Sequence, residues 1–330
     1  MCSRTSPSRS TFDTSTTSSR SRYRPGLPGP VAEARRSGGP RRERCVVIGA
    51  TGQLGSDLVR TCDRPGELVP LSSRDLDILD AASARSTLED LRPTCVLNAA
   101  AYNLVDRAED ERQRAFALNA EAVGALAAVC QTLGAVFVHF STDYVFDGRK
   151  RTPYLESDSP APLSAYGESK LAGERLALER CERTVIFRVS GLFGVAGSSS
   201  KGRTNFVETM LLLAREGKPL HVVADQVLGP SYTLDLARKV WTVLPKVAHP
   251  IYHLTSAGHT SWYDFARRAL ELAGVRADLT PVTAAEFGAR ARRPAYSVLA
   301  HAHLAALGED DLRSWDAALA AYVAERPSAR

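Results

Sequence analysis

The sequence lacks any long hydrophobic stretch. No apolar run among its 330 residues approaches the roughly 18 residues that a membrane-spanning helix needs. Residues 1–43 also lack the apolar segment of a secretory signal; they are rich in Ser, Arg, Pro and Gly and show almost no apolar periodicity. We therefore expect a disordered Ser/Arg-rich extension at residues 1–43, with a transit peptide or a misassigned start codon as alternatives, and no membrane partner.

Cysteine and histidine are few, and neither type is clustered. The six cysteines form no Cys-x-x-Cys pair, and the seven histidines form no group with the spacing of zinc ligands. The sequence therefore predicts no metal site. Cys45 and Cys95 fall at the starts of two apolar runs, where reduced, packed thiols are typical of a cytoplasmic protein.

Lysine is scarce as well, and the net charge of +5 is unevenly distributed. Residues 1–44 contain ten arginines and three acidic residues, a net charge of +7, which leaves −2 for the rest of the chain. Because the excess of positive charge is confined to the predicted extension, it does not indicate a nucleic-acid partner.

Short apolar runs alternate with helical patterns between residues 44 and 190. We expect strands at 45–48, 68–71, 95–100, 135–140 and 184–189, and helices at 53–62, 81–91, 106–133 and 165–180. Strands that alternate with helices pair in parallel, so the expected fold class is α/β with a doubly wound parallel sheet. After residue 191 the pattern loosens, with helices expected at 205–216 and 262–273 and a strand at 251–254. We therefore predict a main domain at 44–190 and, at 191–330, mainly a smaller lobe with some segments returning to the sheet.

Gly49, Gly52 and Gly55 separate the first expected strand from the first expected helix. Glycine allows a tight turn there and lets a diphosphate approach the backbone, while the helix N-terminus presents free N–H groups. In this strand–turn–helix setting the pattern predicts a dinucleotide site. The fold class becomes a Rossmann-type sheet with a smaller, C-terminal substrate-binding lobe.

The end of the second strand suggests which dinucleotide binds. NAD-preferring folds place an acid there, whereas this chain has Ser72 or Ser73 with Arg74 beside it. A hydroxyl and a guanidinium suit a 2′-phosphate, so NADPH is the expected cofactor and NADH the alternative. Asp77 and Ile78 are expected near the adenine. A solvated loop arginine is the other interpretation of Arg74.

Tyr166 and Lys170 lie four residues apart within a predicted helix. At this spacing the two side chains share one face, and the cation lowers the pKa of the phenol, so they can form an acid/base pair. Thr142, upstream, offers a hydroxyl that can hold a substrate oxygen against the phenol. Together the three predict protonation of an alkoxide as a hydride arrives at carbon. A surface tyrosine packed on a lysine stem is the alternative.

Four segments together carry a family resemblance. They are Gly-Ala-Thr-Gly-Gln-Leu-Gly at 49–55, Leu-Asn-Ala-Ala-Ala-Tyr-Asn-Leu-Val-Asp at 97–106, Phe-Ser-Thr-Asp-Tyr-Val-Phe-Asp-Gly at 140–148 and Tyr-Gly-Glu-Ser-Lys-Leu-Ala-Gly-Glu at 166–174. Residues 205–210 and 225–230 extend the likeness. Over about residues 44–300 the chain resembles the extended short-chain dehydrogenase/reductases, and within them the dTDP-4-dehydrorhamnose reductase family.

The resemblance implies roles for the matching residues. Thr142, Tyr166 and Lys170 would be catalytic: Tyr166 donates the proton to the C4 oxygen of a sugar, and Lys170 holds the nicotinamide ribose. Tyr144 would face the sugar. With the residues inferred above, the expected cofactor-binding set is Gly49, Gly52, Gln53, Leu54, Gly55, Arg74, Asp77, Ile78, Ala101, Tyr102, Asn103, Phe140, Tyr166 and Lys170.

One departure from the family lies on the substrate side. The family often has Ser-Trp after the strand at 184–189, whereas this chain has Ser190-Gly191. The loop at 194–203 is extended and carries Lys201 and Arg203. We expect Gly191 and this loop to set the substrate, with one of the two basic side chains closing on the sugar diphosphate. A solvated surface loop is the alternative.

The resemblance implies NADPH-dependent reduction of the C4 keto group of a dTDP-4-keto-6-deoxy sugar, as in dTDP-L-rhamnose biosynthesis. It also implies a nucleotide-sugar partner and a cytoplasmic location, and it allows a homodimer. Two alternatives stay open: a 4-ketoreductase for another nucleotide sugar in a specialised-metabolite pathway, and a non-catalytic regulatory subunit of the same fold. The intact Thr142, Tyr166 and Lys170 argue against the regulatory subunit.

Overall fold

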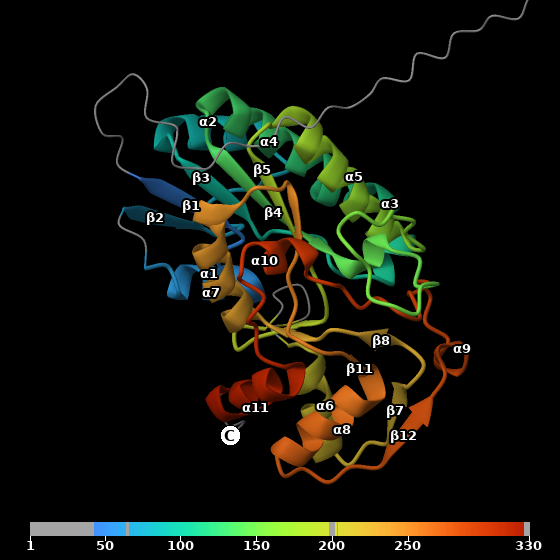
Figure 1. Ribbon diagram of the computed structural model, residues 1–330. Coiled ribbons are helices and arrows are strands. Elements are labelled where there is room, and N and C mark those ends of the chain that lie inside the picture. The colour runs from blue at the N-terminus through green and yellow to red at the C-terminus, as the bar shows by residue number, and fades with distance from the viewer. Residues whose placement is uncertain (1–42, 64–65, 198–201, 203, 327–330) are drawn as a thin grey trace, which may run out of the picture.

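The computed structural model describes residues 43–63, 66–197, 202 and 204–326. The predicted N-terminal extension therefore lies outside the described residues, except for Glu43. Figure 1 shows a sheet with helices on both faces and, below it, a smaller lobe that comes from the second half of the chain.

Six parallel strands form the central sheet, in the order β2-β1-β3-β4-β5-β10. They are β1 Arg44–Ile48, β2 Glu67–Leu71, β3 Cys95–Asn98, β4 Val136–Thr142, β5 Thr184–Val189 and β10 Ile251–His253. The predicted doubly wound parallel sheet is confirmed. The strand order reverses between β1 and β3, and ligands of such sheets bind beyond the carboxyl ends of strands at this switch point.

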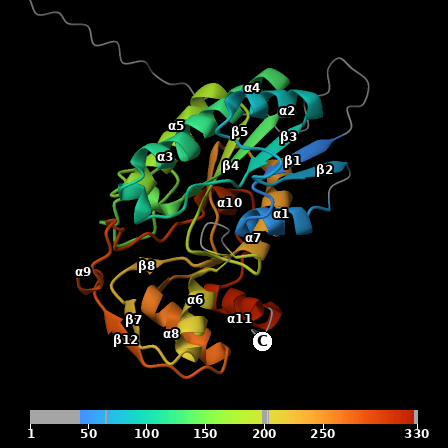
Figure 2. The ribbon, with the colours of Figure 1, turned by 180° about the vertical axis from the view of Figure 1, so that it is seen from behind.

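Helices cover both faces of the sheet (Figures 1 and 2). One face carries α2 Ala81–Leu91, α4 Ala122–Leu133 and α5 Ala165–Arg180. The other carries α1 Gln53–Arg60, α7 Thr233–Val243, η6 Leu244–Lys246 and α10 Ala302–Ala306. Local sequence sets their ends: Asp80 caps α2 by accepting two backbone N–H groups, and α4 stops at Gly134, whose φ is 66°.

The helical region expected at 106–133 is confirmed, but its first half is not a regular α-helix. The segment contains η2 Arg107–Glu109, α3 Arg112–Phe116 and the π-helical turn η3 Ala117–Glu121 before α4 begins. Asn119, fully buried in η3, accepts from the backbone N–H of Tyr102 at 2.9 Å and donates to its carbonyl at 3.0 Å. A Cβ on Gly173 of α5 would lie 2.0 Å from the Asn119 carbonyl oxygen, so α5 packs directly on this bulge.

The helical segment Arg112–Leu133 has the length and mean hydropathy, 1.4 over an 18-residue window, of a membrane-spanning helix. Half of that window is buried inside the protein, and α4 packs against α2 and α5. Core packing in this fold therefore accounts for its apolar composition.

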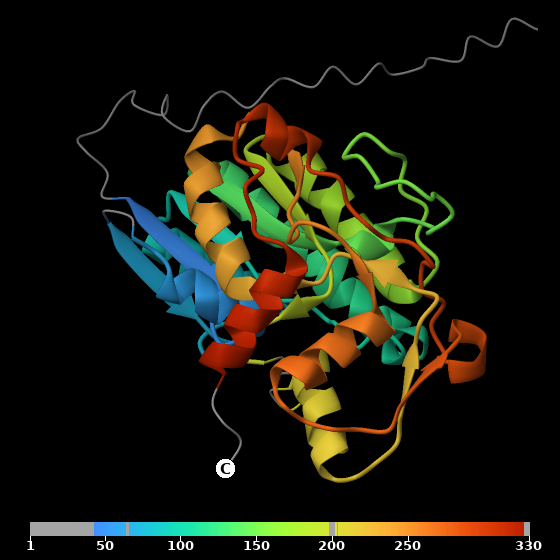
Figure 3. The ribbon, with the colours of Figure 1, turned by 60° about the horizontal axis from the view of Figure 1, so that its bottom comes forward.

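Among its described residues, the C-terminal lobe combines four helices with three two-stranded sheets. The helices are α6 Phe206–Arg215, α8 Trp262–Leu272, α9 Ala284–Phe287 and α11 Trp315–Glu325. The strand pairs are β6 Leu192–Phe193 with β9 Ser231–Tyr232, β7 Leu220–Val223 with β12 Leu279–Val282, and β8 Val227–Leu228 with β11 Thr260–Ser261. Phe193, Phe265 and Tyr322 form its aromatic core, and α11 packs on α8 (Figure 3). The predicted helices at 205–216 and 262–273 are confirmed to within a residue at each end.

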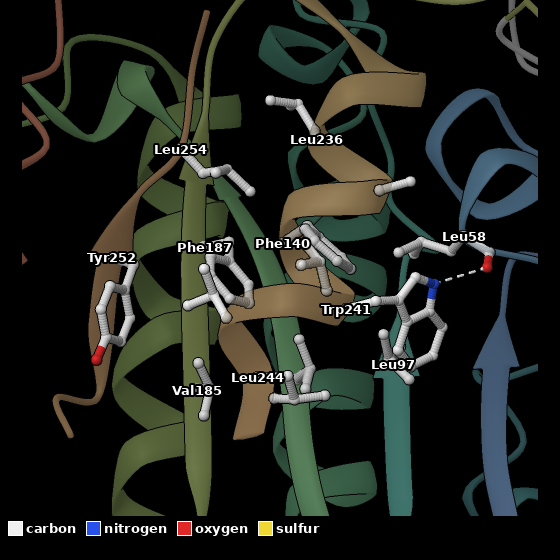
Figure 4. Close-up of a cluster of buried hydrophobic side chains, with 14 of the residues drawn as sticks. Leu58, Leu97, Phe140, Val185, Phe187, Leu236, Trp241, Leu244, Tyr252 and Leu254 are labelled. Carbon is white, nitrogen blue, oxygen red and sulfur yellow. Dashed lines mark hydrogen bonds between the residues drawn. The ribbon is translucent and has the colours of Figure 1, made fainter. Parts of the chain in front are cut away.

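A second apolar core holds α1 and α7 against the sheet (Figure 4). Phe140 stacks on Phe187 at 5.9 Å between ring centres, and Trp241 of α7 donates a hydrogen bond to the Leu58 carbonyl of α1 at 3.0 Å. Truncating an aromatic side chain in such a core costs about 3–5 kcal/mol. The core therefore fixes α1, and with it the glycine turn at its start.

Candidate active site

A cavity of about 560 Å³ lies beyond the carboxyl ends of β1, β3, β4 and β5, with the C-terminal lobe forming its far wall. Its lining includes the glycine turn, the segments that follow β2, β3, β4 and β5, and the starts of α5, α6 and α8. The cavity therefore occupies the switch point of the sheet, where the glycine pattern predicts a dinucleotide.

The three glycines of the turn each occupy a position that a side chain would disturb. Gly49 has φ 78°, and a Cβ there would lie 2.8 Å from the Ala100 nitrogen. A Cβ on Gly52 or Gly55 would lie 3.2 Å or 2.1 Å from the Gly49 carbonyl oxygen. The turn thus keeps its backbone open to the cavity and leads into the N-terminus of α1, whose N–H groups favour an anion.

Tyr166 lies in the first turn of α5, which Ser164 caps by accepting from the Gly167 N–H. Its ring lines the cavity and meets the Tyr144 ring edge-on, with centroids 5.9 Å apart. Burial raises the Tyr166 pKa to about 12; a hydrogen bond with Thr142 opposes that rise, and the charge of Asp143 adds to it. The phenol is therefore protonated near neutral pH and can act as an acid.

Lys170 follows one helical turn later, and its side chain is almost completely buried. Its Nζ donates to the Phe140 carbonyl at 2.6 Å and lies 3.2 Å from Nε2 of His139. Burial lowers the Lys170 pKa to about 8, and the charge of Glu174 partly offsets that shift. Lys170 thus has a lowered pKa and follows the acid Tyr166 by one turn of α5, with its amine on Phe140 and His139.

Asp143 begins the short helix η4 Asp143–Val145 that follows β4, and three hydroxyl groups surround its carboxylate. Thr142 donates to Oδ1 at 3.0 Å, while Ser190 and Ser297 donate to Oδ2 at 2.8 Å and 2.5 Å. Burial raises the Asp143 pKa to about 6 although all three hydrogen bonds lower it. This network fixes the Thr142 hydroxyl at the cavity wall.

The first residue after β2 that lines the cavity is a serine. Ser73 and Asp77 line it, whereas Arg74 is exposed and does not. The Ser72 hydroxyl donates to the Asp75 carboxylate at 2.6 Å, which lowers the Asp75 pKa. Ser72 is therefore held within its own turn, and Ser73 is the hydroxyl available to a ligand.

Comparison with known proteins identifies the family. The model of the RmlD substrate binding domain matches residues 43–327. The chain belongs to the RmlD substrate binding domain family. This confirms the resemblance inferred from the four motifs, including that to the dTDP-4-dehydrorhamnose reductases.

This chain aligns with individual relatives of the RmlD family over nearly their whole length. The chain is 37% identical to a dTDP-4-dehydrorhamnose reductase of Burkholderia thailandensis, over 82% of this chain and 95% of that protein. It is 40% identical to a probable dTDP-4,6-dihydroxy-2-methyloxan-3-one 4-ketoreductase of Streptomyces antibioticus, over 84% and 93%. A crystal structure of dTDP-4-dehydrorhamnose reductase from Bacillus anthracis in complex with NADP superposes with a TM-score of 0.82 at 35% identity, covering 86% of this chain and all of that one.

Most of the site residues expected from the sequence lie on the cavity. The expected residues that line it are Gly49, Gly52, Gln53, Leu54, Asp77, Ile78, Ala101, Asn103, Thr142, Tyr144, Tyr166 and Gly191. Those that do not line it are Gly55, Arg74, Tyr102, Phe140 and Lys170. Lys201 and Arg203 lie outside the described residues.

Three of the five residues off the lining pack elsewhere, while Arg74 and Lys170 have the surroundings given above. Gly55 packs inside α1 against the turn, and Phe140 belongs to the core. Tyr102 is buried, with its hydroxyl donating to Glu111 at 3.0 Å. Among the side chains that the structure describes, no group of three His, Cys, Asp or Glu is placed to hold a metal ion.

Several cavity residues escaped the sequence reasoning. Phe206 and Trp262, with ring centroids 4.6 Å apart, form an apolar wall from α6 and α8. Asp143 lay inside a recognised motif, but its partner Ser297 is 154 residues away. Arg293 hydrogen-bonds Tyr144 and forms a two-pronged ion pair with Asp106 at 3.0 Å and 2.7 Å. The only local sequence feature that could have drawn attention to Arg293 is the arginine next to it at 292.

Proposed function

We propose that this protein uses NADPH to reduce the C4 keto group of a dTDP-4-keto-6-deoxy sugar in the cytoplasm. The observation that carries the proposal is that Tyr166 and Thr142 share one cavity with the glycine turn of β1 and α1. An acid and a hydroxyl at the switch point of a dinucleotide fold are suited to carbonyl reduction. The names of the relatives favour the same reaction.

The residues present fit NADPH. The glycine turn leaves the space that a Cβ would fill, and two buried polar atoms of the described cavity wall, Gln53 Oε1 and Ser141 Oγ, have no protein partner. Gln53 and Leu54 would hold the diphosphate at the start of α1, and Asp77 and Ile78 the adenosine. Ala101 and Asn103 would lie along its length. When bound, NADPH supplies the hydride that is added to C4.

The protein's own part in the reaction is to orient and protonate the carbonyl. Thr142, whose hydroxyl donates to Asp143 at 3.0 Å in this structure, would turn that proton to the keto oxygen when the sugar binds, and Tyr166 would donate its hydroxyl proton to the same oxygen. The charge of Lys170 would ease that transfer by lowering the Tyr166 pKa once its side chain turns from Phe140 towards the ribose. Tyr144, Phe206 and Trp262 would exclude water from the sugar end of the cavity.

A different nucleotide sugar is the second candidate, and Gly191 favours it. Gly191 has φ 52°, and a Cβ there would lie 2.8 Å from Leu228 Cδ1 and 3.1 Å from Pro230 Cα. The indole that the family often has at this position would therefore displace Leu228, and the apolar wall comes instead from α6 and α8. Lys201 and Arg203 as clamps on the sugar diphosphate stay a prediction, as does a homodimer.

The test is NADPH oxidation across a panel of nucleotide 4-keto sugars, with Tyr166→Phe as the inactive control. We expect turnover of at least one dTDP-4-keto-6-deoxy sugar, and the panel then identifies the preferred one. Turnover only with another nucleotide would support the second candidate. NADPH binding without turnover of any member would refute the reductase and leave the regulatory subunit.

A further inference from the structure

Three buried polar side chains form a chain behind the catalytic tyrosine. Asn98 ends β3, His139 lies in β4 and Lys170 in α5, and their exposed fractions are 0%, 0% and 1%. Nδ2 of Asn98 lies 3.4 Å from Nδ1 of His139, and Nε2 of His139 lies 3.2 Å from Nζ of Lys170. The role of Lys170 in holding the ribose does not require the other two.

Asn98 determines which nitrogen of His139 carries the proton. Its Oδ1 accepts from the Ala100 N–H at 3.2 Å, so its Nδ2 must face His139. An amide nitrogen only donates, and Nδ1 of His139 must therefore accept. Burial keeps the His139 pKa well below its usual range, so the ring is neutral with its single proton on Nε2.

That Nε2–H points at the Lys170 amine. A neutral amine has a lone pair that accepts this proton, whereas an ammonium has three donors and no acceptor. With neutral Lys170 both contacts pair a donor with an acceptor, because His139 donates to Nζ and Nζ donates to the Phe140 carbonyl at 2.6 Å. With charged Lys170 two donors meet at Nε2; moving the proton to Nδ1 instead makes two donors meet at Asn98.

We propose that His139, oriented by Asn98, is a positioning residue that favours the neutral amine of Lys170 in the cofactor-free protein, so that NADPH binding at mildly alkaline pH takes up a proton at Lys170. The proton comes from solvent and converts the amine to an ammonium. The inference rests on the proposed cofactor. Its phosphates bring negative charge into the cavity, which favours the ammonium form.

Proton uptake measured at pH 8 has to be separated from changes at the other ionisable groups around Lys170. On α5, Tyr166 has a pKa of about 12 and Glu174 pairs with Arg188 of β5 at 2.7 Å. Asp143, after β4, has a pKa of about 6. α4 contributes the buried Cys130, whose pKa burial raises, and Glu121 of η3 is exposed. The 2′-phosphate of NADPH loses its second proton near pH 6 and is fully ionised at pH 8.

The test is calorimetric titration with NADPH at pH 8 and pH 9, each in buffers of different ionisation enthalpy. Because the Lys170 pKa is lowered to about 8, part of the cofactor-free protein carries a neutral Lys170 at pH 8, and we expect proton uptake on NADPH binding that is larger at pH 9 than at pH 8. The Kd should weaken towards tenfold per pH unit above pH 8. Binding without proton uptake at either pH would overturn the inference and leave the proposed function intact. Absence of binding would overturn both.

Two variants assign the effect to His139. His139→Phe keeps a buried ring without the Nε2–H, and His139→Gln offers an oxygen that can accept from the ammonium. Both should raise the Lys170 pKa, so that uptake at pH 8 falls at least twofold. His303→Phe, on α10 with its Nδ1 2.7 Å from the Ile251 carbonyl oxygen, is the matched control and should keep the wild-type proton count. A folded His139 variant with wild-type uptake would show that His139 is merely structural.

Discussion

Replacing Ser297 by alanine removes one of the three hydroxyls that donate to the buried Asp143 carboxylate. Ser297 is 2% exposed and does not line the cavity, so the change leaves the ligand-binding surface intact. Its Oγ lies 2.5 Å from Oδ2 of Asp143. A hydrogen bond to a charged group contributes about 1.5–3 kcal/mol, equivalent to about one to two pH units in the pKa of Asp143.

The pH at which this loss appears follows from the direction of the Asp143 shift. Burial raises the pKa from 3.8 to about 6, so protonation stabilises the folded state, and that stability is lost as the pH rises from 3.8 through about 6. Removing the Ser297 hydroxyl raises the pKa further. Ser297→Ala should therefore lower the free energy of unfolding by about 1.5–3 kcal/mol at pH 8 and by much less at pH 5, where the carboxyl is already protonated.

Urea unfolding at the two pH values measures the difference directly. Ser256→Ala is the matched control, because Ser256 is equally buried and its Oγ has no partner among the described residues. In the kcat/KM profile, which should fall below about pH 6 as Asp143 is protonated and releases Thr142, Ser297→Ala should move the acid limb upward by roughly one to two units. An equal loss of stability at both pH values, with an unmoved acid limb, would refute a charged Asp143.

Three other substitutions test separate parts of the site. Tyr166→Phe should lower kcat by about 10²–10⁴-fold with little change in NADPH affinity, and retention of a tenth of the turnover would remove the acid assignment. If Arg74 reaches the 2′-phosphate, Arg74→Ala should shift relative affinity towards NADH by about tenfold to a hundredfold in a fluorescence titration; an unchanged ratio would leave it a solvated residue. Gly191→Ala should lower the free energy of unfolding by about 1–2 kcal/mol because φ is 52°, and an unchanged denaturation midpoint would contradict that backbone requirement.

The parts of the fold that the sequence predicted depend on local patterns. The five strands before residue 190 and the helix Ala165–Arg180 follow from runs of apolar residues, caps and breakers within a few positions. The glycine turn was recognised from its spacing: Gly52 and Gly55 meet the backbone of the turn itself, although Gly49 meets Ala99 and Ala100 beyond β3. Such features need no knowledge of how distant segments pack.

The π-helical turn shows where this reasoning stops. Residues 106–133 have a helical pattern, but Asn119 bonds to the backbone of Tyr102 and α5 approaches it closely through Gly173. A buried amide with backbone partners outside its own helix can bend that helix, and no periodicity reveals it. The same limit applies to His139, because its hydrogen-bond partners, Asn98 and Lys170, come from two other elements.

The two ends of the cavity differ in how far sequence can describe them. The three residues proposed as catalytic lie in β4 and in the first half of α5, so two short motifs include them all. The wall around the sugar combines Gly191 with Phe206, Leu228 and Trp262, which come from separate elements of the lobe. The volume of the pocket depends on these four residues together. Having glycine at position 191, where the family often has tryptophan, therefore does not by itself define the shape of the substrate. The reaction can therefore be inferred from motifs, whereas the identity of the sugar requires the substrate panel.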